Sequence, residues 1–203
     1  PVMEGKAVLF KKFAGIDVFD IEIDESDPHK LVDIIASLEP TFGAINLEDI
    51  KSPDCFIVER ELRQRMNIPV FHDDQHGTAI AVLASLINAL NITGKRIENA
   101  KFVFSGAGAG AIASTKLLLD YGAKIITLVD STGIIHKGRK DLTPIKTSML
   151  ETTNPENLEG GLADAMRDAD VFIGLSVAGI VSAEMVSSMA RNASRLPSGV
   201  SQE

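Results

Sequence analysis

Two pairs of acidic residues directly follow short apolar runs that have the composition of β-strands. Glu48 and Asp49 end the first pattern, and Asp73 and Asp74 end the second. Because the carboxyl ends of neighbouring parallel strands lie at one edge of a sheet, we expect these four carboxylates to gather there. A hard divalent cation such as Mg²⁺ or Mn²⁺ takes oxygen ligands and would neutralise their repulsion. Spacing alone leaves a second interpretation open, in which the acids are solvated loop residues or helix N-caps.

A glycine-rich turn, residues 105–111, carries the second candidate chemistry. It follows the strand-forming run 102–104 and precedes an apolar helical stretch, and a second strand-forming run then ends at Asp130. Strand, glycine turn, helix, strand and acid within about thirty residues is the organisation of a dinucleotide-binding unit. Gly106 would allow the tight turn, Gly108 would let the backbone approach a pyrophosphate, and the helix N-terminus would offer its N–H groups. Small-residue turns also occur for packing alone, and that alternative stays open for the motif by itself.

The identity of the dinucleotide depends on the charges after the second strand. An acid at the position of Asp130 can accept hydrogen bonds from a ribose 2′-hydroxyl and would repel a 2′-phosphate, which favours NAD. Lys137, Arg139 and Lys140 follow closely and could bind that phosphate. The prediction is therefore NAD or NADP, with a weak preference for NAD.

The elements that must position these residues alternate between helices and strands. The pattern predicts helices over 6–14, 28–38, 55–66, 161–167 and 182–190, and strands over 16–23, 43–47, 68–71, 102–104, 125–129 and 170–173. The run 77–91 is apolar nearly all round, which predicts a buried helix linking two domains. We therefore expect an α/β fold with two parallel-sheet domains, the second a Rossmann-type dinucleotide-binding domain.

Composition excludes several classes of protein. The 203 residues are 45% hydrophobic and 24% charged, as in soluble globular domains. A net charge of −8 without any basic run argues against a nucleic-acid partner. One cysteine, Cys55, excludes an intrachain disulfide and fits a cytoplasmic location. No apolar run approaches the roughly 20 residues of a membrane-spanning helix, so no membrane partner is expected.

Four segments carry a family resemblance. Pro69–Ala79 reads PVFHDDQHGTA and resembles the signature segment of bacterial-type malic enzymes, the decarboxylating malate dehydrogenases. Pro1–Phe10, Asn46–Ile50 and Ser105–Ala109 also resemble segments of that family, in the same order. The resemblance covers residues 1 to 192 or so. It implies the oxidative decarboxylation of (S)-malate to pyruvate and CO₂, with reduction of NAD(P)⁺ and help from Mg²⁺ or Mn²⁺.

Roles for single residues also follow from this resemblance. It implies that residues 1–74 are part of the N-terminal catalytic domain, and that 75–203 are the NAD(P)-binding domain, incomplete at its C-terminal end. The implied metal ligands are Glu48, Asp49 and Asp74, the implied general base is Lys6, and Asp73 would hold Lys6 or the metal site in place. The implied cofactor residues are Gly106, Ala107, Gly108, Ala109, Gly110 and Asp130. Without the resemblance, Lys6 would be interpreted as a solvent-facing residue on the first turn of a helix.

The chain also departs from the family pattern. The family's proton-donating acid is a tyrosine upstream of the lysine, whereas Tyr121 lies at the end of the helix after the glycine turn, where it is expected to pack. The family also continues into a strand that ends at an active-site asparagine, whereas residues 193–199 here contain no apolar strand. We therefore expect an internal or truncated piece of a malic enzyme. That piece is expected to be inactive alone, and the full-length protein is expected to be a homodimer acting on small molecules.

Two interpretations from other classes remain open. One is a metal-free Rossmann dehydrogenase, for example of amino acids, in which the acids are structural. The other is a non-catalytic dinucleotide-binding module. Dependence of turnover on a metal ion separates malic enzyme from the first, and an effect of a chelator on malate turnover separates it from the second.

Overall fold

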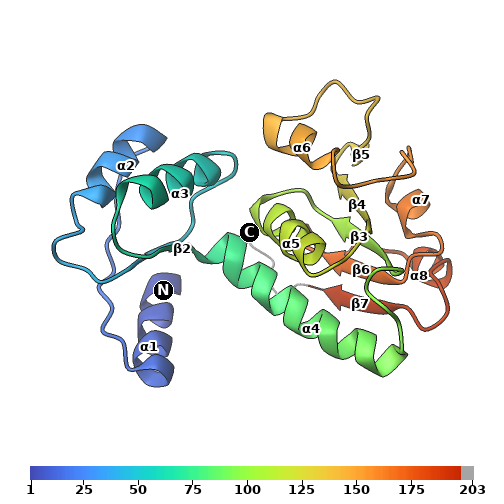
Figure 1. Cartoon of the computed structure of the whole chain (residues 1–203), viewed down its shortest axis with the longest axis horizontal. Coiled ribbons are helices and arrows are strands. Elements are labelled where there is room, and N and C mark those ends of the chain that lie inside the picture. The colour runs from blue at the N-terminus through green and yellow to red at the C-terminus, as the bar shows by residue number, and fades with distance from the viewer. Residues whose placement is uncertain (198–203) are drawn as a thin grey trace. The chain divides into compact units, whose positions relative to one another are not determined.

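The computed structural model describes residues 1–197 and divides the chain into two compact units, Pro1–Asp73 and Asp74–Glu203. Each unit has an α/β organisation, which confirms the predicted fold class. The elements of the first unit, labelled in Figure 1, are α1 (Val2–Ala14), α2 (Pro28–Ala36), β1 (Ile45–Leu47), α3 (Asp54–Arg65) and β2 (Val70–His72).

A parallel strand pair with two helices forms the core of the first unit. β1 and β2 pair in parallel, with Ile45 opposite Val70 and Leu47 opposite His72. α3 connects the two strands and packs on α2, and one buried cluster joins the helices to the strands: Val32, Ile35, Leu47, Val58, Leu62 and Met66. Because a helical crossover returns the chain in the same direction, both strands end at the same edge, as predicted.

The N-terminal part of the first unit agrees with the sequence only in its helices. Gly15 ends α1 in the left-handed conformation, with φ of 69°, and the Asp27 side chain caps α2 by accepting hydrogen bonds from the N–H groups of His29 and Lys30. The strand predicted over 16–23 was wrong, because the described chain is irregular there. Its apolar side chains are largely exposed, with Phe19 at 71%, so the alternation of apolar and acidic residues does not bury one face of a sheet.

A five-stranded sheet forms the core of the second unit. Its strands are β3 (Lys101–Ser105), β4 (Ile125–Asp130), β5 (Gly133–Ile134), β6 (Val171–Gly174) and β7 (Ser194–Pro197). The order is β5-β4-β3-β6-β7, and only β5 is antiparallel to its neighbour. The chain runs from β3 to β4 on one side and later returns to β6 on the other side of β3. The strand order therefore reverses at β3, which is the feature of doubly wound sheets that bind dinucleotides.

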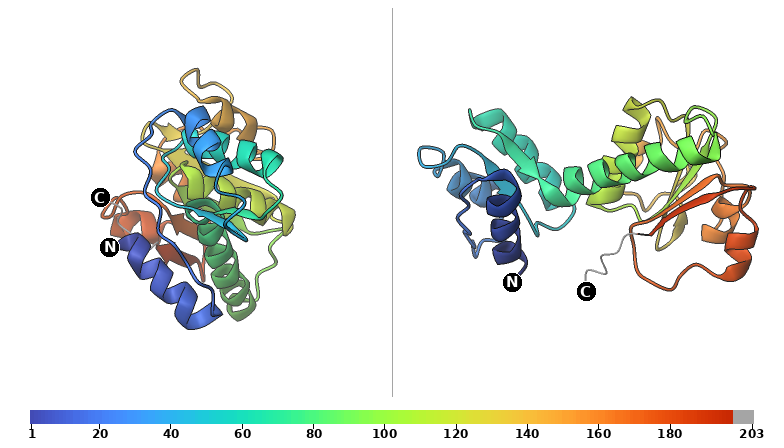
Figure 2. Two further views of the ribbon diagram at one scale, coloured as in Figure 1. Left: turned by 90° about the vertical axis from the view of Figure 1, so that its left-hand side faces the viewer. Right: turned by 90° about the horizontal axis from the view of Figure 1, so that it is seen from below.

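Helices cover both faces of this sheet. They are α4 (Thr78–Thr93), α5 (Ala109–Asp120), α6 (Pro144–Met149), α7 (Leu162–Met166) and α8 (Ala183–Ser187). A single π-helical turn, η1 (Asp73–Gly77), directly precedes α4. Figures 1 and 2 show α4 and α5 on one side of the sheet and α7 and α8 on the other. On the second side, Val103, Val129 and Phe172 of the sheet pack with Met166 of α7 and Met185 of α8.

Two expectations for the second unit need correction. The helix predicted over 77–91 forms, but only one face of α4 is buried in the described chain, and Ile80 and Ile92 are 57% and 86% exposed. Together with η1 it makes a 21-residue helical stretch that is long and apolar enough to span a membrane by length and composition alone. The statement that no run approaches that length was therefore wrong.

The C-terminal tail also differs from the prediction. Residues 194–197 form β7, which pairs in parallel with β6, although this segment carries no apolar run. Backbone hydrogen bonds supply the pairing, and it begins directly before β6, where the Ser194 N–H donates to the Asp170 carbonyl at 2.9 Å. A polar edge strand of this kind has no hydrophobic signal in the sequence. Residues 198–203 of the predicted tail lie outside the described residues.

Candidate active site

Lys6 lies between two carboxylates at the edge where β1 and β2 end. Its Nζ donates hydrogen bonds to Glu48 Oε2 and to Asp73 Oδ2. Glu48 directly follows β1 and Asp73 directly follows β2, so the parallel pair places both acids at one edge. The Glu48 side chain is 4% exposed, whereas that of Asp73 is 38% exposed. Three of the predicted site residues are thus in direct contact.

The charge state of Lys6 follows from these contacts. Burial of its ammonium group disfavours the charged form, but the hydrogen bonds to Asp73 and Glu48 outweigh that effect and raise the pKa of Lys6. Lys6 therefore keeps its proton in this arrangement and compensates part of the local negative charge.

Three carboxylates form a compact cluster beside this lysine. One carboxylate oxygen from each of Glu48, Asp49 and Asp74 can be chosen so that all three lie within 4.8 Å of one another. Asp74 is bonded to Asp73 and is thus the second residue after β2. Asp49 has φ of 57°, a left-handed conformation that aspartate tolerates better than most residues and that turns the chain directly after β1. Oxygen donors at this separation match the ligands that Mg²⁺ and Mn²⁺ prefer, so the residues fit the implied metal.

The glycines of the turn after β3 differ in what surrounds them. Gly106 has φ of 115°, and a Cβ there would lie 2.6 Å from the Leu175 carbonyl oxygen, so the residue must be glycine. A Cβ on Gly110 would lie 3.1 Å from the Asp74 carbonyl oxygen and 3.0 Å from Thr78 Cγ2, which shows a close approach of α5 to the start of α4. Gly108 is the N-cap of α5, and a Cβ there would meet nothing within 4 Å. Open space above a helix N-terminus is what a pyrophosphate needs, so this turn fits a dinucleotide.

Asp130 ends β4 with every acceptor position of its carboxylate in use. Oδ1 accepts from Arg139 Nη1 at 2.8 Å and from the Thr132 N–H at 3.0 Å, and Oδ2 accepts from Arg139 Nη2 at 3.1 Å and from Lys146 Nζ at 2.7 Å. Burial raises the pKa of Asp130, but these bonds from Arg139, Lys146 and Thr132 together hold it far below its ordinary value. The predicted role of Asp130 toward a ribose stays a prediction.

Two contacts of this edge were missed by sequence reasoning. Lys146 is in α6, sixteen residues after Asp130 in the chain, and only the fold of the connecting segment brings it back. Ser105 at the end of β3 and Ser176 after β6 share a hydrogen bond with an Oγ–Oγ distance of 2.7 Å. Neither contact has a local spacing signal, because both join segments that are distant in sequence.

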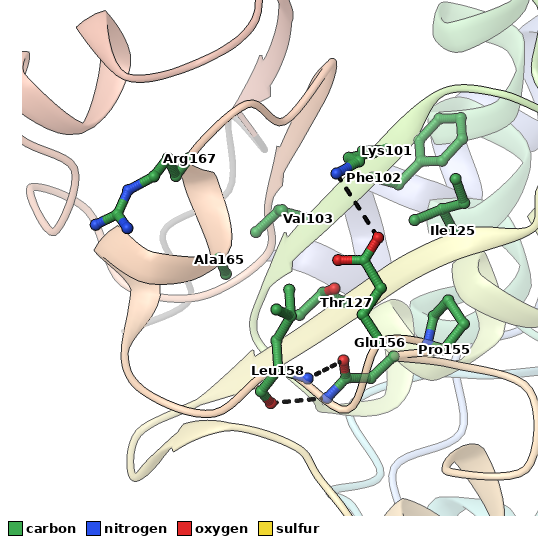
Figure 3. Close-up of a pocket in the computed structure, with 11 residues that line it drawn as sticks. Lys101, Phe102, Val103, Ile125, Thr127, Pro155, Glu156, Leu158, Ala165 and Arg167 are labelled. Atoms are coloured by element: carbon green, nitrogen blue, oxygen red, sulfur yellow. Dashed lines mark hydrogen bonds and ion pairs between the residues drawn. The ribbon is translucent and has the colours of Figure 1, made fainter.

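A small cavity lies at the opposite, amino-terminal ends of the strands. Figure 3 shows it between Lys101 of β3, Ile125 of β4 and the segment that carries Glu156 and Leu158. Lys101 Nζ lies 3.8 Å from Glu156 Oε1. With a volume of about 30 Å³ it has room for no more than a few water molecules. It is not a substrate site, and the candidate chemistry stays at the carboxyl ends of the strands.

Comparison with known proteins assigns both parts of the chain. Residues 1–63 match the family model described as malic enzyme, N-terminal domain, and residues 75–197 match malic enzyme, NAD binding domain. The chain is 59% identical over 192 residues to an NADP-dependent malic enzyme of Haemophilus influenzae, covering 94% of this chain and 25% of the relative. It is 52% identical over 193 residues to the bifunctional malic/malolactic enzyme of Bacillus subtilis, covering 95% of this chain and 47% of the relative.

A solved structure agrees with these sequence matches. The crystal structure of an NAD-dependent malic enzyme from Thermotoga maritima superposes with a TM-score of 0.93 at 47% identity, covering 96% of this chain and 52% of that one. This chain thus spans between a quarter and about half of the length of these relatives. With both family models matched in order along it, the chain belongs to the malic enzyme family.

Proposed function

We propose that the protein carrying this chain oxidises and decarboxylates (S)-malate to pyruvate and CO₂, reducing NAD(P)⁺ with a divalent cation bound. The observation that carries the proposal is the contact of Lys6 with Glu48 and Asp73, beside the carboxylate cluster formed by Glu48, Asp49 and Asp74. The names of the relatives, all malic enzymes, support the same reaction.

Glu48, Asp49 and Asp74 would hold the cation in this proposal. Each offers a carboxylate oxygen, and three such ligands leave positions on Mg²⁺ or Mn²⁺ for the substrate. A bound cation lowers the pKa of the malate hydroxyl and, by its charge, favours the neutral form of a nearby lysine.

Lys6 would receive the proton of the malate hydroxyl. Its Nζ is held by Glu48 and Asp73, so the amine has a defined position at the edge where the cluster lies. Asp73 is a positioning residue in this scheme, because it contacts Lys6 and is not a member of the cluster. A general base must lie within hydrogen-bonding reach of the proton that it removes, and the contact of Lys6 with Glu48, a member of the cluster, supports that role.

The turn from Gly106 to Gly110 would bind the dinucleotide, with its pyrophosphate above Gly108 at the α5 N-terminus. The electrostatic preference for NAD weakens, because Arg139 and Lys146 compensate the charge of Asp130. Relatives of this chain are named for either cofactor. We therefore propose NAD or NADP without preference.

We also propose a homo-oligomer for the full-length protein, in the cytoplasm. α1 has no buried residue in the described chain, and Phe13 and Phe19 are 77% and 71% exposed. Apolar surface of this kind is typical of what subunit interfaces cover. Sedimentation of the full-length protein tests the assembly, and a monomer at micromolar concentration would contradict it.

Substitution of Lys6 tests the proposed reaction. In the full-length protein, Lys6→Ala should abolish Mn²⁺-dependent formation of NAD(P)H from malate, by at least about a hundredfold, since general bases contribute about 10²–10⁴ in rate. The dissociation constant of the dinucleotide should stay nearly unchanged. Lys12→Ala, an exposed lysine on the same helix, is the matched control. Malate turnover that survives in Lys6→Ala, or that needs no divalent cation, would contradict the proposal.

A further inference from the structure

The two faces of the strand pair β1 and β2 carry different kinds of side chain. Ile45 and Leu47 of β1 pack in the core cluster of the first unit. Because successive side chains of a strand point to opposite faces, Asn46 and the following Glu48 lie on the other face. The pairing register, continued by one residue past the strands, places Asp73 beside Glu48. This second face is therefore the one that carries the candidate active site.

Two nitrogen donors converge on one oxygen of Glu48. Lys6 Nζ donates to Glu48 Oε2, and Asn46 Nδ2, 3.5 Å from the same oxygen, donates to it as well. An ionised carboxylate only accepts hydrogen bonds, so the amide of Asn46 must turn its NH₂ group toward it. Each carboxylate oxygen has two lone pairs, and Lys6 and Asn46 use both of those on Oε2. A cation at the cluster of Glu48, Asp49 and Asp74 would then be bound through Glu48 Oε1.

The Glu48 carboxylate depends on such contacts for its orientation. Its side chain is 4% exposed, and it offers an oxygen within 4.8 Å of oxygens of Asp49 and Asp74. Repulsion among these charges disfavours the gathered arrangement, and the long glutamate side chain has the rotamer freedom to turn away. Asn46 is fixed in β1, two residues from Glu48 on the same face, so its amide can hold the carboxylate in place. Asparagine is depleted in strands, so strand formation does not explain this half-buried residue.

We propose that Asn46 is a positioning residue for Glu48, and that it directs Oε1 of that carboxylate to the cation while Lys6 keeps its contact with Oε2. This inference rests on the proposed function, because it concerns the cation site of that reaction. Asn46 acts through Glu48 and supplies no ligand of its own. Loss of a residue that orients a metal ligand typically costs about ten- to hundredfold in metal affinity. For one long hydrogen bond we expect the lower end of that range, about tenfold.

Two substitutions of Asn46 test the proposal by Mn²⁺ binding to the full-length protein without malate, with free Mn²⁺ measured by its electron paramagnetic resonance signal. Asn46→Leu keeps nearly the same volume and removes the amide. Asn46→Thr favours the strand, and its shorter side chain does not reach Glu48. Both variants should bind Mn²⁺ about tenfold more weakly. The affinity for the dinucleotide, measured without Mn²⁺, should stay unchanged.

An asparagine elsewhere in the first unit provides the matched control. Asn67 is exposed, and its Nδ2 donates to Glu39 Oε1 at 3.2 Å, so it forms the same kind of amide–carboxylate bond outside the cluster. Asn67→Leu should therefore leave the Mn²⁺ affinity unchanged. An equal loss of Mn²⁺ affinity in Asn67→Leu would show a general effect on the unit and overturn the role of Asn46.

Turnover at saturating Mn²⁺ separates a positioning residue from a catalytic one. Mass action restores occupancy of a weakened site, so both Asn46 variants should regain nearly the unmutated kcat as Mn²⁺ is raised. Lys6→Ala should stay inactive under the same conditions, because its loss concerns the proton transfer. A kcat of the Asn46 variants that stays low at saturating Mn²⁺ would overturn the positioning role.

The remaining outcomes distinguish this inference from the proposed function. Unchanged Mn²⁺ affinity in both Asn46 variants would overturn the inference and leave the proposed cation site in place. A loss in only one of them would assign the effect to side-chain volume or strand fit, and would also overturn it. If the unmutated protein binds no Mn²⁺, or if Asp74→Ala does not weaken that binding, the proposed cation site is wrong and the inference falls with it.

Discussion

Four hydrogen bonds fill the carboxylate of Asp130, and the fold therefore stabilises its ionised form. Its side chain is 8% exposed and lies against Arg139 and Lys146. Because the folded-state pKa is depressed below the unfolded value of about 3.9, this group contributes stability that is fully present above about pH 4. The contribution is lost as the pH falls below that value, because the Asp130 carboxylate takes up a proton in the unfolded chain at a higher pH than in the folded chain.

Asp130→Asn should make the free energy of unfolding depend less on pH under acidic conditions. Urea unfolding followed between about pH 5 and pH 2 should show a smaller loss of stability in the variant than in the unmutated chain. At neutral pH the variant should be less stable by about 1–3 kcal/mol, since Lys146 loses its bond to the Asp130 carboxylate and Arg139 keeps only that to Asp141. Glu151→Gln, at an exposed acid, is the control. Parallel pH profiles for Asp130→Asn and the unmutated chain would contradict this account.

The carboxylate cluster makes a separate prediction at the residue scale. Mn²⁺ at millimolar concentration should raise the thermal midpoint of the chain, because a ligand that binds only the folded state stabilises it by mass action. Asp74→Ala should remove that increase, whereas Asp20→Ala, at an exposed acid outside the cluster, should keep it. A midpoint of the unmutated chain that ignores Mn²⁺ would show that the site is not assembled in these 203 residues.

At the scale of elements, two glycines of the turn between β3 and α5 have different roles: Gly106 is required by the fold, and Gly108 leaves space for a ligand. Gly106→Ala should destabilise the second unit, because φ of 115° and the Leu175 carbonyl both exclude a Cβ. Gly108→Ala should leave stability nearly unchanged, since its φ of −86° suits alanine and nothing lies within 4 Å.

The affinity for the dinucleotide, in contrast to stability, should change in Gly108→Ala. A methyl group there would occupy the open space at the helix N-terminus, so the dinucleotide should bind at least about tenfold more weakly, as expected for a lost phosphate approach. Thermal unfolding and calorimetry on the same protein check both halves of the prediction. A Gly108→Ala protein with unchanged affinity would show that the pyrophosphate lies elsewhere.

The elements with strong local signals were predictable from sequence. α2 has Asp27 as N-cap and Pro28 in its first turn, and β3 and β4 are apolar runs between glycines, so propensity and environment agree. The predictions were wrong where the local sequence pattern does not match the presence or absence of a neighbouring strand. Residues 16–23 alternate like a strand but have no strand neighbour in the described chain, and β7 is polar but finds β6 as its neighbour.

The candidate site was predictable in part. The gathering of Glu48, Asp49, Asp73 and Asp74 follows from the rule that parallel strands end at one edge. The position of Lys6 does not, because its helix has no buried face and no periodicity that would direct it to that edge. The partners of Asp130 and the serine pair depend on long-range folding, which a single sequence does not specify.

At the scale of the molecule, the chain has two units, and each has its own buried core. Val58 and Leu62 belong to the first core, and Val103 and Met166 to the second. The apolar pattern of 77–91 was interpreted as a buried helix because periodicity records only which residues are apolar, not how many neighbours surround them. α4 is buried on one face and exposed on the other within the described chain, so the extent of burial was beyond the reach of the sequence.

The close approach at Gly110 has a consequence for energetics. α5 touches the backbone of Asp74, so the helix that would meet the pyrophosphate and the residue that would meet the cation belong to one packed contact. Their two binding free energies should then contain a shared coupling term, and such coupling is reciprocal. Dinucleotide should tighten Mn²⁺ by the same factor, about fivefold or more, by which Mn²⁺ tightens dinucleotide. Gly110→Ala, which displaces the Asp74 carbonyl by a few tenths of an ångström, should change that factor. If neither ligand changes the affinity for the other in the unmutated protein, a coupling factor of one, the two ligands bind independently despite the contact at Gly110.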